Sequence, residues 1–236
     1  MNSTVIRRAA QLGLLGQVVF VASYLVAGLW QGPRYSFMAH VMSDMYAETA
    51  PGGWFLVVMF TFCGVATVLF AALAVWPTLR QSGWWAAAGA IVLGFSIYGL
   101  GDVLSPFERE ACRLADPGCT ATSQLANAGG NLDNTLSFPG ILLFLVAVFL
   151  IASAMKRTPG WKSWVWPMRW AGAAFFLVLV LDTVAYGLQW HLDGLMERLL
   201  ATTGCVILGA LAWRIQAAAG ESAGADVVGA AVPVQN

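Results

Sequence analysis

Charged side chains are scarce in this chain. Only 10% of its 236 residues are Asp, Glu, Lys or Arg, whereas a soluble domain contains roughly 25%. The 12 basic residues balance the 12 acidic ones, so the formal net charge is zero and no global positive field exists to hold nucleic acid. The composition therefore argues against an ordinary soluble domain and against a nucleic-acid partner.

Residues that bind metals or act as nucleophiles are also few. The two histidines, His40 and His191, fall in separate predicted loops, and the chain has four cysteines. It contains no His pair at i, i+4, no Gly-rich phosphate loop and no Gly-x-Ser-x-Gly elbow. The sequence predicts no metal site and no cofactor, and it gives no support for nucleophilic catalysis.

The chain is instead 59% hydrophobic, with 25 Gly and 11 Trp. Crossing a bilayer takes roughly 20 apolar helical residues, because lipid offers no partner for a free backbone N–H or C=O. Six stretches meet this requirement, at about 9–30, 54–76, 84–104, 136–155, 170–190 and 195–215. We predict an all-α transmembrane bundle of six spans over residues 1–216, and a flexible cytoplasmic tail over 217–236.

Basic residues near the span ends predict the orientation, because they are held on the cytoplasmic side. With the N-terminus inside, eight fall on the inner face and four on the outer face. The inner eight are Arg7, Arg8, Arg80, Lys156, Arg157, Lys162, Arg169 and Arg214. The outer four are Arg34, Arg109, Arg113 and Arg198. We expect both termini in the cytoplasm and a location in the cell membrane, either a bacterial inner membrane or a plasma membrane.

Two cysteines lie in the loop predicted between the third and fourth spans. This loop falls on the outer side, where a disulfide between Cys112 and Cys119 can persist. We expect that bridge, with two free thiols as the alternative. Cys63 and Cys205 lie within spans, where a thiol usually behaves as a small apolar side chain.

The first outer loop has a helical pattern of apolar residues. Met38, Val41, Met42 and Met45 occur at i, i+3, i+4 and i+7 within residues 35–48. This spacing predicts a short amphipathic helix on the outer leaflet, with His40 and Asp44 one turn apart on its other side. A solvated connecting helix is the alternative.

Two carboxyl groups fall inside predicted spans, Asp102 and Asp182. A carboxylate at such a depth is costly and normally faces the bundle interior or a wet cavity. Other polar groups collect at the same outer ends, among them Glu108, Glu110 and Asp133. We predict a cavity that opens outward, floored by Asp182 and rimmed by Asp102, His191, Glu197 and Arg198. In the alternative interpretation, Asp182 only joins two helices.

Three short motifs resemble a known family. They are His40-x-x-Ser43-Asp44, then Pro51-Gly52-Gly53-Trp54, and Gly194-Leu195-x-Glu197-Arg198. Together with the six-span layout they resemble the uncharacterised bacterial multi-pass membrane family named domain of unknown function 998. The resemblance implies a compact six-helix bundle with an outward polar site, and no established activity. Where that family often has a His at the start of the fourth span, this chain has Asn131-Leu132-Asp133-Asn134.

Two functions fit these observations. One is an enzyme that acts on a membrane lipid, an isoprenoid-like substrate or another amphipathic small molecule by carboxyl acid–base chemistry. The other is a non-catalytic binding, accessory or permease-like bundle. The candidate catalytic residues are Asp182, Asp102 and Asp44. The candidate binding residues are His40, Tyr186, Trp190, His191, Glu197 and Arg198.

Overall fold

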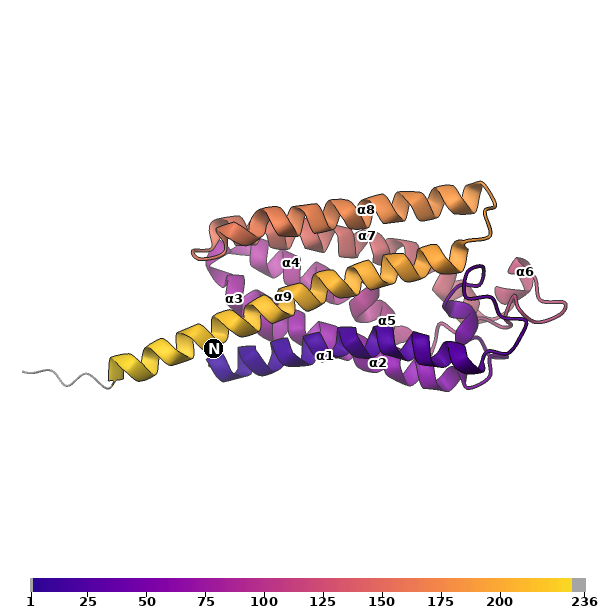
Figure 1. Cartoon of the computed structure of the whole chain (residues 1–236), viewed down its shortest axis with the longest axis horizontal. Helices are drawn as coiled ribbons and strands as arrows, with labels where there is room; N and C mark the ends of the chain where they lie inside the picture. The colour runs from indigo at the N-terminus through magenta and orange to yellow at the C-terminus, as the bar shows by residue number, and fades with distance from the viewer. Residues whose placement is uncertain (1, 231–236) are drawn as a thin grey trace, which may run out of the picture.

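The chain folds into an elongated bundle of long helices (Figure 1). The computed structural model describes residues 2–230, and it contains no strand in that range. Six helical stretches are long and apolar enough to cross a membrane: Ser3–Trp30, Gly53–Ser82, Trp84–Leu104, Ala128–Arg157, Lys162–Gly187 and Asp193–Glu221. The predicted six-span, all-α fold is therefore confirmed, and the chain is a multi-pass membrane bundle.

The first three spans are each built from several helical segments. The first consists of α1 (Ser3–Ala27) and the 3-10 turn η1 (Gly28–Trp30). The second consists of α2 (Gly53–Phe70), the π-helical η3 (Ala71–Val75), α3 (Trp76–Leu79) and the 3-10 turn η4 (Arg80–Ser82). The third consists of α4 (Trp84–Phe95), the π-helical η5 (Ile97–Gly101) and α5 (Asp102–Leu104).

The last three spans contain longer helices. They are α7 (Ala128–Arg157), α8 (Val165–Gly187), which follows the 3-10 turn η6 (Lys162–Trp164), and α9 (Asp193–Ala230). The helix α9 runs well past residue 217, where the sequence analysis expected the tail to begin. The flexibility of that tail stays a prediction, and residues 231–236 lie outside the described part of the chain.

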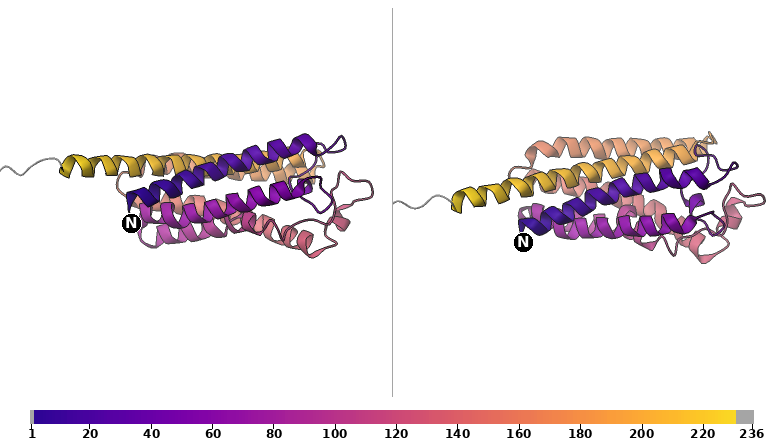
Figure 2. Two further views of the ribbon diagram at one scale, coloured as in Figure 1. Left: turned by 90° about the horizontal axis from the view of Figure 1, so that it is seen from below. Right: turned by 60° about the horizontal axis from the view of Figure 1, so that its bottom comes forward.

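Helices distant in sequence pack side by side. The first span packs against the last and the second, since α1 contacts α9 and α2, while α4 packs on α7 and α8 lies against α7 and α9. The views in Figure 2 show α1, α2 and α9 running along one another. Phe70, Phe144 and Phe175 fill the interior and are fully buried.

The third and fourth spans are both interrupted at one level. Ser96 has extended backbone angles between α4 and η5, and its hydroxyl donates to the Leu93 carbonyl at 2.7 Å. Pro139 lies inside α7 and has no N–H to donate. Gly140 packs against this break, because a Cβ there would lie 3.1 Å from the Ile97 nitrogen. Two neighbouring helices thus lack complete backbone hydrogen bonding where they meet.

The expected amphipathic helix over residues 35–48 is wrong. Segment 31–52 consists of turns, and its one helical piece among the described residues is the 3-10 turn η2 (Ser43–Met45). Met42 and Met45 are buried against protein and therefore do not reach lipid. Arg198 donates to the Phe37 and His40 carbonyls, so these groups are satisfied without a helix.

We call the end of the bundle that carries segments 31–52, 105–127 and 188–192 the loop end (Figure 1, right). The opposite end, which we call the basic end, carries arginines stacked on tryptophans. The guanidinium of Arg157 lies 4.4 Å from the ring centroid of Trp85, and that of Arg214 lies 5.3 Å from the ring centroid of Trp161. Tryptophan is enriched where a membrane meets water, and the face of its ring attracts a guanidinium.

Candidate functional site

A cavity of about 240 Å³ lies at the loop end of the bundle. Segment 41–46 and residues 105–108 contribute to its wall together with residues from the long helices α1, α2, α7, α8 and α9. The short segments η5 and α5, which follow the break at Ser96, supply a further part of the lining. The cavity thus joins residues that are far apart in sequence.

Four carboxyl groups line this cavity, each from a different element. They are Asp102 of α5, Glu108 of the following loop, Asp133 of α7 and Glu197 of α9. Glu197 accepts a hydrogen bond from the Met42 N–H at 2.5 Å, and Asp133 accepts one from the Ser137 hydroxyl at 3.3 Å. Most of the carboxyl oxygens in the cavity therefore remain free to accept further hydrogen bonds.

Asp102 and Glu108 are the least satisfied of the four. Asp102 is 8% exposed, and its carboxyl oxygens make no hydrogen bond to any described residue. Glu108 is 4% exposed, and its Oε1 has no hydrogen-bond partner in the described part of the chain. Since buried polar groups are normally paired, these two carboxyls are the strongest indication of function in the cavity.

Aromatic side chains form the apolar part of the wall. Phe20 and Phe60 stack with ring centroids 4.6 Å apart, and Tyr46 meets Phe60 edge-on at 5.9 Å. Tyr98 hydrogen-bonds through its hydroxyl to the Ala201 carbonyl at 3.0 Å, which ties the third span to α9. The cavity therefore combines acidic groups with aromatic faces.

Two glycines allow the helices around the cavity to approach closely. A Cβ at Gly64 would lie 2.6 Å from the Gly99 carbonyl oxygen and 2.9 Å from Cβ of Asp102. A Cβ at Gly204 would lie 2.0 Å from the Tyr98 hydroxyl. The absence of a side chain at these positions lets Asp102 and Tyr98 reach their places.

Arg198 fastens the loop above the cavity to α9. Its Nη1 donates to the carbonyls of Phe37 at 3.0 Å, His40 at 2.8 Å and Gly194 at 2.6 Å. Its Nη2 donates to the Tyr35 hydroxyl. The donors of Arg198, a predicted binding residue, are thus largely occupied by the protein itself.

A buried polar network lies beside the cavity. The side chain of Gln124 donates to Glu110 at 2.7 Å and to Asp44 at 2.9 Å. Ser43, which lines the cavity, donates to Glu110 at 3.2 Å. Asp44 also accepts from the Leu114 N–H at 2.9 Å. The network therefore connects the cavity wall to the loop that holds the two outer cysteines.

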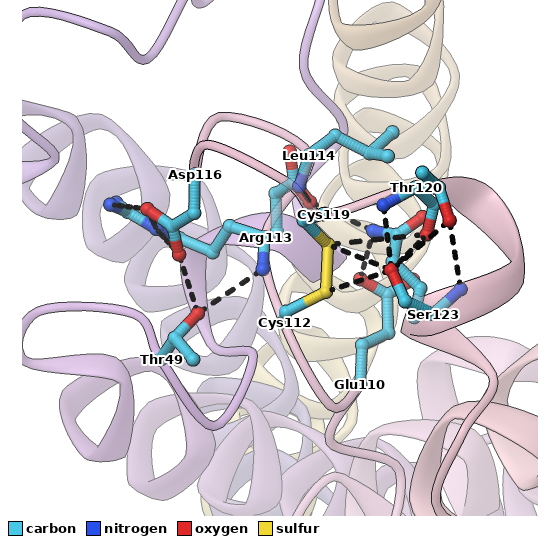
Figure 3. The surroundings of a disulfide bond; sticks show 11 residues. Thr49, Glu110, Cys112, Arg113, Leu114, Asp116, Cys119, Thr120 and Ser123 are labelled. Atoms are coloured by element: carbon cyan, nitrogen blue, oxygen red, sulfur yellow. Dashed lines mark hydrogen bonds and ion pairs between the residues drawn. A yellow bond between two sulfur atoms is a disulfide. The ribbon is translucent and has the colours of Figure 1, made fainter.

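Cys112 and Cys119 form a disulfide, with 6.0 Å between their Cα atoms, as the sequence predicted (Figure 3). Within the closed loop, Arg113 pairs with Asp116 at 2.6 Å. Figure 3 shows Thr49 joining this pair, since its hydroxyl donates to Asp116 at 2.6 Å. The disulfide loop is thereby attached to segment 31–52. Cys63 and Cys205 are free and buried.

Of the predicted site residues, the structure places Asp102 and Glu197 together in the cavity. Asp44 is fully buried in the neighbouring network. His40 accepts from the Ser36 N–H through Nδ1 at 2.8 Å and is not part of the cavity lining.

The other predicted residues lie around the connection between α8 and α9. Asp182 is half-buried on α8 and does not line the cavity. Tyr186 and Trp190 are 68% and 52% exposed, and His191 is exposed as well. The expected arrangement, with Asp182 as the floor beneath Asp102, does not form in this structure. The roles assigned to these residues stay predictions.

Neither Glu108 nor Asp133 was predicted from the sequence as a site residue. Glu108 and Asp133 were noted only as polar groups near the outer ends of the spans. For Asp133 a signal exists, because its i, i+4 spacing to Ser137 places these two residues on one face of a helix. For Glu108 no sequence signal shows its burial, because it follows Pro106 in an irregular loop.

Burial changes the acidity of the loop glutamates. It raises the pKa of Glu108 to about 7, with Asp133 adding to the rise, and the pKa of Glu110 to about 8. By contrast, hydrogen bonds from Arg113 hold the pKa of Asp116 below its usual range. Glu108 therefore changes its charge near neutral pH.

The carboxyls of the cavity are not arranged as a metal centre. No group of three or more His, Cys, Asp or Glu side chains within the described residues is placed to hold a metal ion. The arrangement can instead bind an organic group, or transfer a proton through Asp102 or Glu108.

Comparison with known protein families gives a match over most of the chain. A family model described as Protein of unknown function (DUF998) matches residues 14–214. No curated protein and no solved structure matches the chain.

Proposed function

The chain belongs to this family of proteins of unknown function, and because that description names no activity, we propose from the cavity that it is a membrane binding protein. Its ligand is an amphipathic small molecule or lipid. The observation that carries this proposal is the cavity of about 240 Å³, whose wall joins four carboxyls to aromatic rings. Ligand sites typically combine an apolar wall with a few polar groups of this kind.

We place the protein in the cell membrane with the loop end outside. Eight of the twelve basic residues fall on the opposite side in this orientation, in keeping with the distribution of Lys and Arg in membrane proteins. The disulfide at the loop end also favours an oxidising exterior. A ligand then approaches from the exterior side.

The test compares two tryptophan substitutions on α7. Ile141 lines the cavity, whereas Leu142 is 39% exposed on the outside of the bundle and serves as the control. We expect mass spectrometry to find a small molecule that co-purifies with wild type and Leu142→Trp and is depleted in Ile141→Trp. Equal amounts in all three folded proteins would contradict binding in this cavity.

A second candidate function is acid–base catalysis on the bound molecule. The free carboxyl of Asp102 favours it, because a buried acid without a hydrogen-bond partner is available to exchange a proton with a ligand. We expect any product formed from a membrane lipid extract to disappear with Asp102→Asn and to persist with Asp182→Asn. If the product disappeared with Asp182→Asn and persisted with Asp102→Asn, Asp182 on α8 would be the catalytic acid instead.

A further inference from the structure

The chemical class of the ligand can be read from the charges of the cavity. This step rests on the proposed binding function. We propose that the ligand is an organic cation, with a positively charged nitrogen near the carboxyls and an apolar part against the aromatic wall.

The first support is that no cationic side chain pairs with the cavity carboxyls. None of the four cavity carboxyls forms a salt bridge with a described residue, since the two ion pairs among those residues are Arg113 with Asp116 and Arg214 with Glu221. The nearby cations are held elsewhere. Arg109 donates to the carbonyls of Tyr46 at 2.9 Å and Ala47 at 3.0 Å.

Arg198 is held in the same way by the carbonyls of Phe37, His40 and Gly194. The Nη donors of Arg198 thus go to backbone oxygens, the Tyr35 hydroxyl and the Met45 sulfur, and its Nε has no partner among the described residues. Neither arginine forms a salt bridge with a cavity carboxyl. A ligand with positive charge is the natural counterpart of such a site, because a buried carboxylate is costly unless it is paired.

The second, independent support is the orphan atom of Glu108. This side chain is 96% removed from solvent, it lines the cavity, and its Oε1 has no hydrogen-bond partner in the described part of the chain. An ammonium N–H, or a methylated ammonium in close contact, would provide the missing favourable interaction.

The third support is the aromatic wall. The faces of aromatic rings attract cations, and the stacked pair Phe20 and Phe60 lies in the same cavity as the carboxyls. A compact divalent metal ion fits less well, because it requires several oxygen ligands converging on one point. The described residues offer no such group of three acids. An organic cation can touch separated carboxyls and rings at once.

The pKa of Glu108 gives this inference a pH dependence. Burial raises that pKa to about 7, so the side chain gains its negative charge between pH 6 and 8. The other acids that face it across the cavity are Asp102, Asp133 and Glu197, from α5, α7 and α9. A cation with a fixed charge should bind more tightly as the pH rises through this interval.

The experiment uses the full-length protein in lipid nanodiscs and three benzyl compounds of similar size. They are benzyltrimethylammonium, which carries a fixed positive charge, the neutral neopentylbenzene and the anion benzylsulfonate. Calorimetry at pH 8 should show binding of the cation about tenfold or more stronger than that of either other compound. Binding of the cation should weaken at pH 6.

Two carboxamide variants provide the matched comparison. Glu108→Gln removes a cavity carboxyl and should weaken cation binding about tenfold. Glu48→Gln removes an exposed carboxyl at the same end, which does not line the cavity, and should change nothing. Glu108→Gln should fold, because it replaces a buried acid by a neutral group of the same shape.

The outcomes separate this inference from the proposed function. If the neutral or anionic compound binds as well as the cation, and Ile141→Trp blocks that binding, the cavity is a binding site and the cation class is wrong. If no compound binds to the folded protein at millimolar concentration, the cation inference fails, while the co-purification test with Ile141→Trp still decides the proposed function.

Discussion

At the scale of single residues, the cavity depends on two glycines as well as on the side chains that line it. Gly64 lets the third span approach α2 so closely that Asp102 reaches the cavity, and Gly204 makes room for the Tyr98 hydroxyl. The sequence showed many glycines and the rule that they permit close helix contact. It does not show which glycine faces which helix, because that depends on the rotation of each helix about its axis.

Gly64→Ala should lower the stability of the protein by about 1–3 kcal/mol, the usual cost of overpacking a close contact. The added methyl group would meet the backbone of the third span at Gly99 and Val103, and backbone yields less easily than a side chain. Gly94→Ala is the matched control, because nothing lies within 4 Å of a Cβ there. Thermal unfolding in one detergent measures both. Equal melting temperatures would show that the contact at Gly64 relaxes without cost.

Glu110 should make the folded protein less stable as the pH rises. Its folded pKa of about 8 exceeds the ordinary value of 4.5, mainly through burial, with Asp133, Asp44 and Glu197 adding repulsion. The folded state therefore holds the proton more tightly than the unfolded chain. Its contribution to stability is complete below about pH 4.5 and is lost as the pH rises through 8.

The measurement is the melting temperature between pH 5 and 9. Wild type should show a falling curve, and Glu110→Gln should flatten its alkaline part, because the carboxamide stays neutral throughout. An unchanged slope in Glu110→Gln would assign the pH dependence to other acids.

At the scale of elements, the loop end was the part least accessible to sequence reasoning. The spacing of the methionines fits a helix, yet Met42 and Met45 are buried against protein and the chain between residues 31 and 52 forms turns. A hydrophobic period tells which side chains are apolar but not whether lipid or protein will cover them. The contacts from Arg198 that hold this segment come from the other end of the sequence.

Removing the disulfide should loosen the loop next to the cavity. Cys112 and Cys119 are separated by seven positions in the sequence, and closing so short a loop is worth about 2–3 kcal/mol in the chain-entropy account. In the double variant Cys112→Ser, Cys119→Ser, the Leu114 amide, which donates to Asp44, should exchange its hydrogen faster. Hydrogen exchange with mass spectrometry measures this.

Cys205→Ala is the control, because this free thiol is buried in α9 far along the chain from the loop. It should leave exchange at Leu114 unchanged. Unchanged exchange in the double serine variant would mean that the polar network around Gln124 holds the loop without the disulfide.

At the scale of the whole molecule, the sequence was most informative. Six apolar stretches separated by Pro, Gly and charged residues were sufficient to predict six spans, because lipid forces each crossing segment into a helix of similar length. The depth and partners of the acids were harder to predict. Asp102 and Glu197 meet in the cavity while Asp182 does not line it, and this outcome depends on how six helices are rotated and paired.

The proposed orientation can be tested with single cysteines in intact cells. Glu48→Cys at the loop end and Lys162→Cys at the basic end replace exposed residues. The native cysteines are either buried or bridged, so they should give little background. A maleimide that does not cross membranes should label Glu48→Cys directly and Lys162→Cys only after permeabilisation. The opposite pattern would place the cavity on the cytoplasmic side.

The interruption shared by the third and fourth spans has a mechanical consequence. Ser96 and Pro139 weaken the backbone ladder at the same level of the bundle, and α4 and α7 pack against each other there. Between that level and the basic end, the two helices are continuous and stiff. Between that level and the loop end, they bend more easily. A change in bilayer thickness would therefore bend the bundle at this interruption. The cavity at the loop end would change shape, while the basic end would stay rigid.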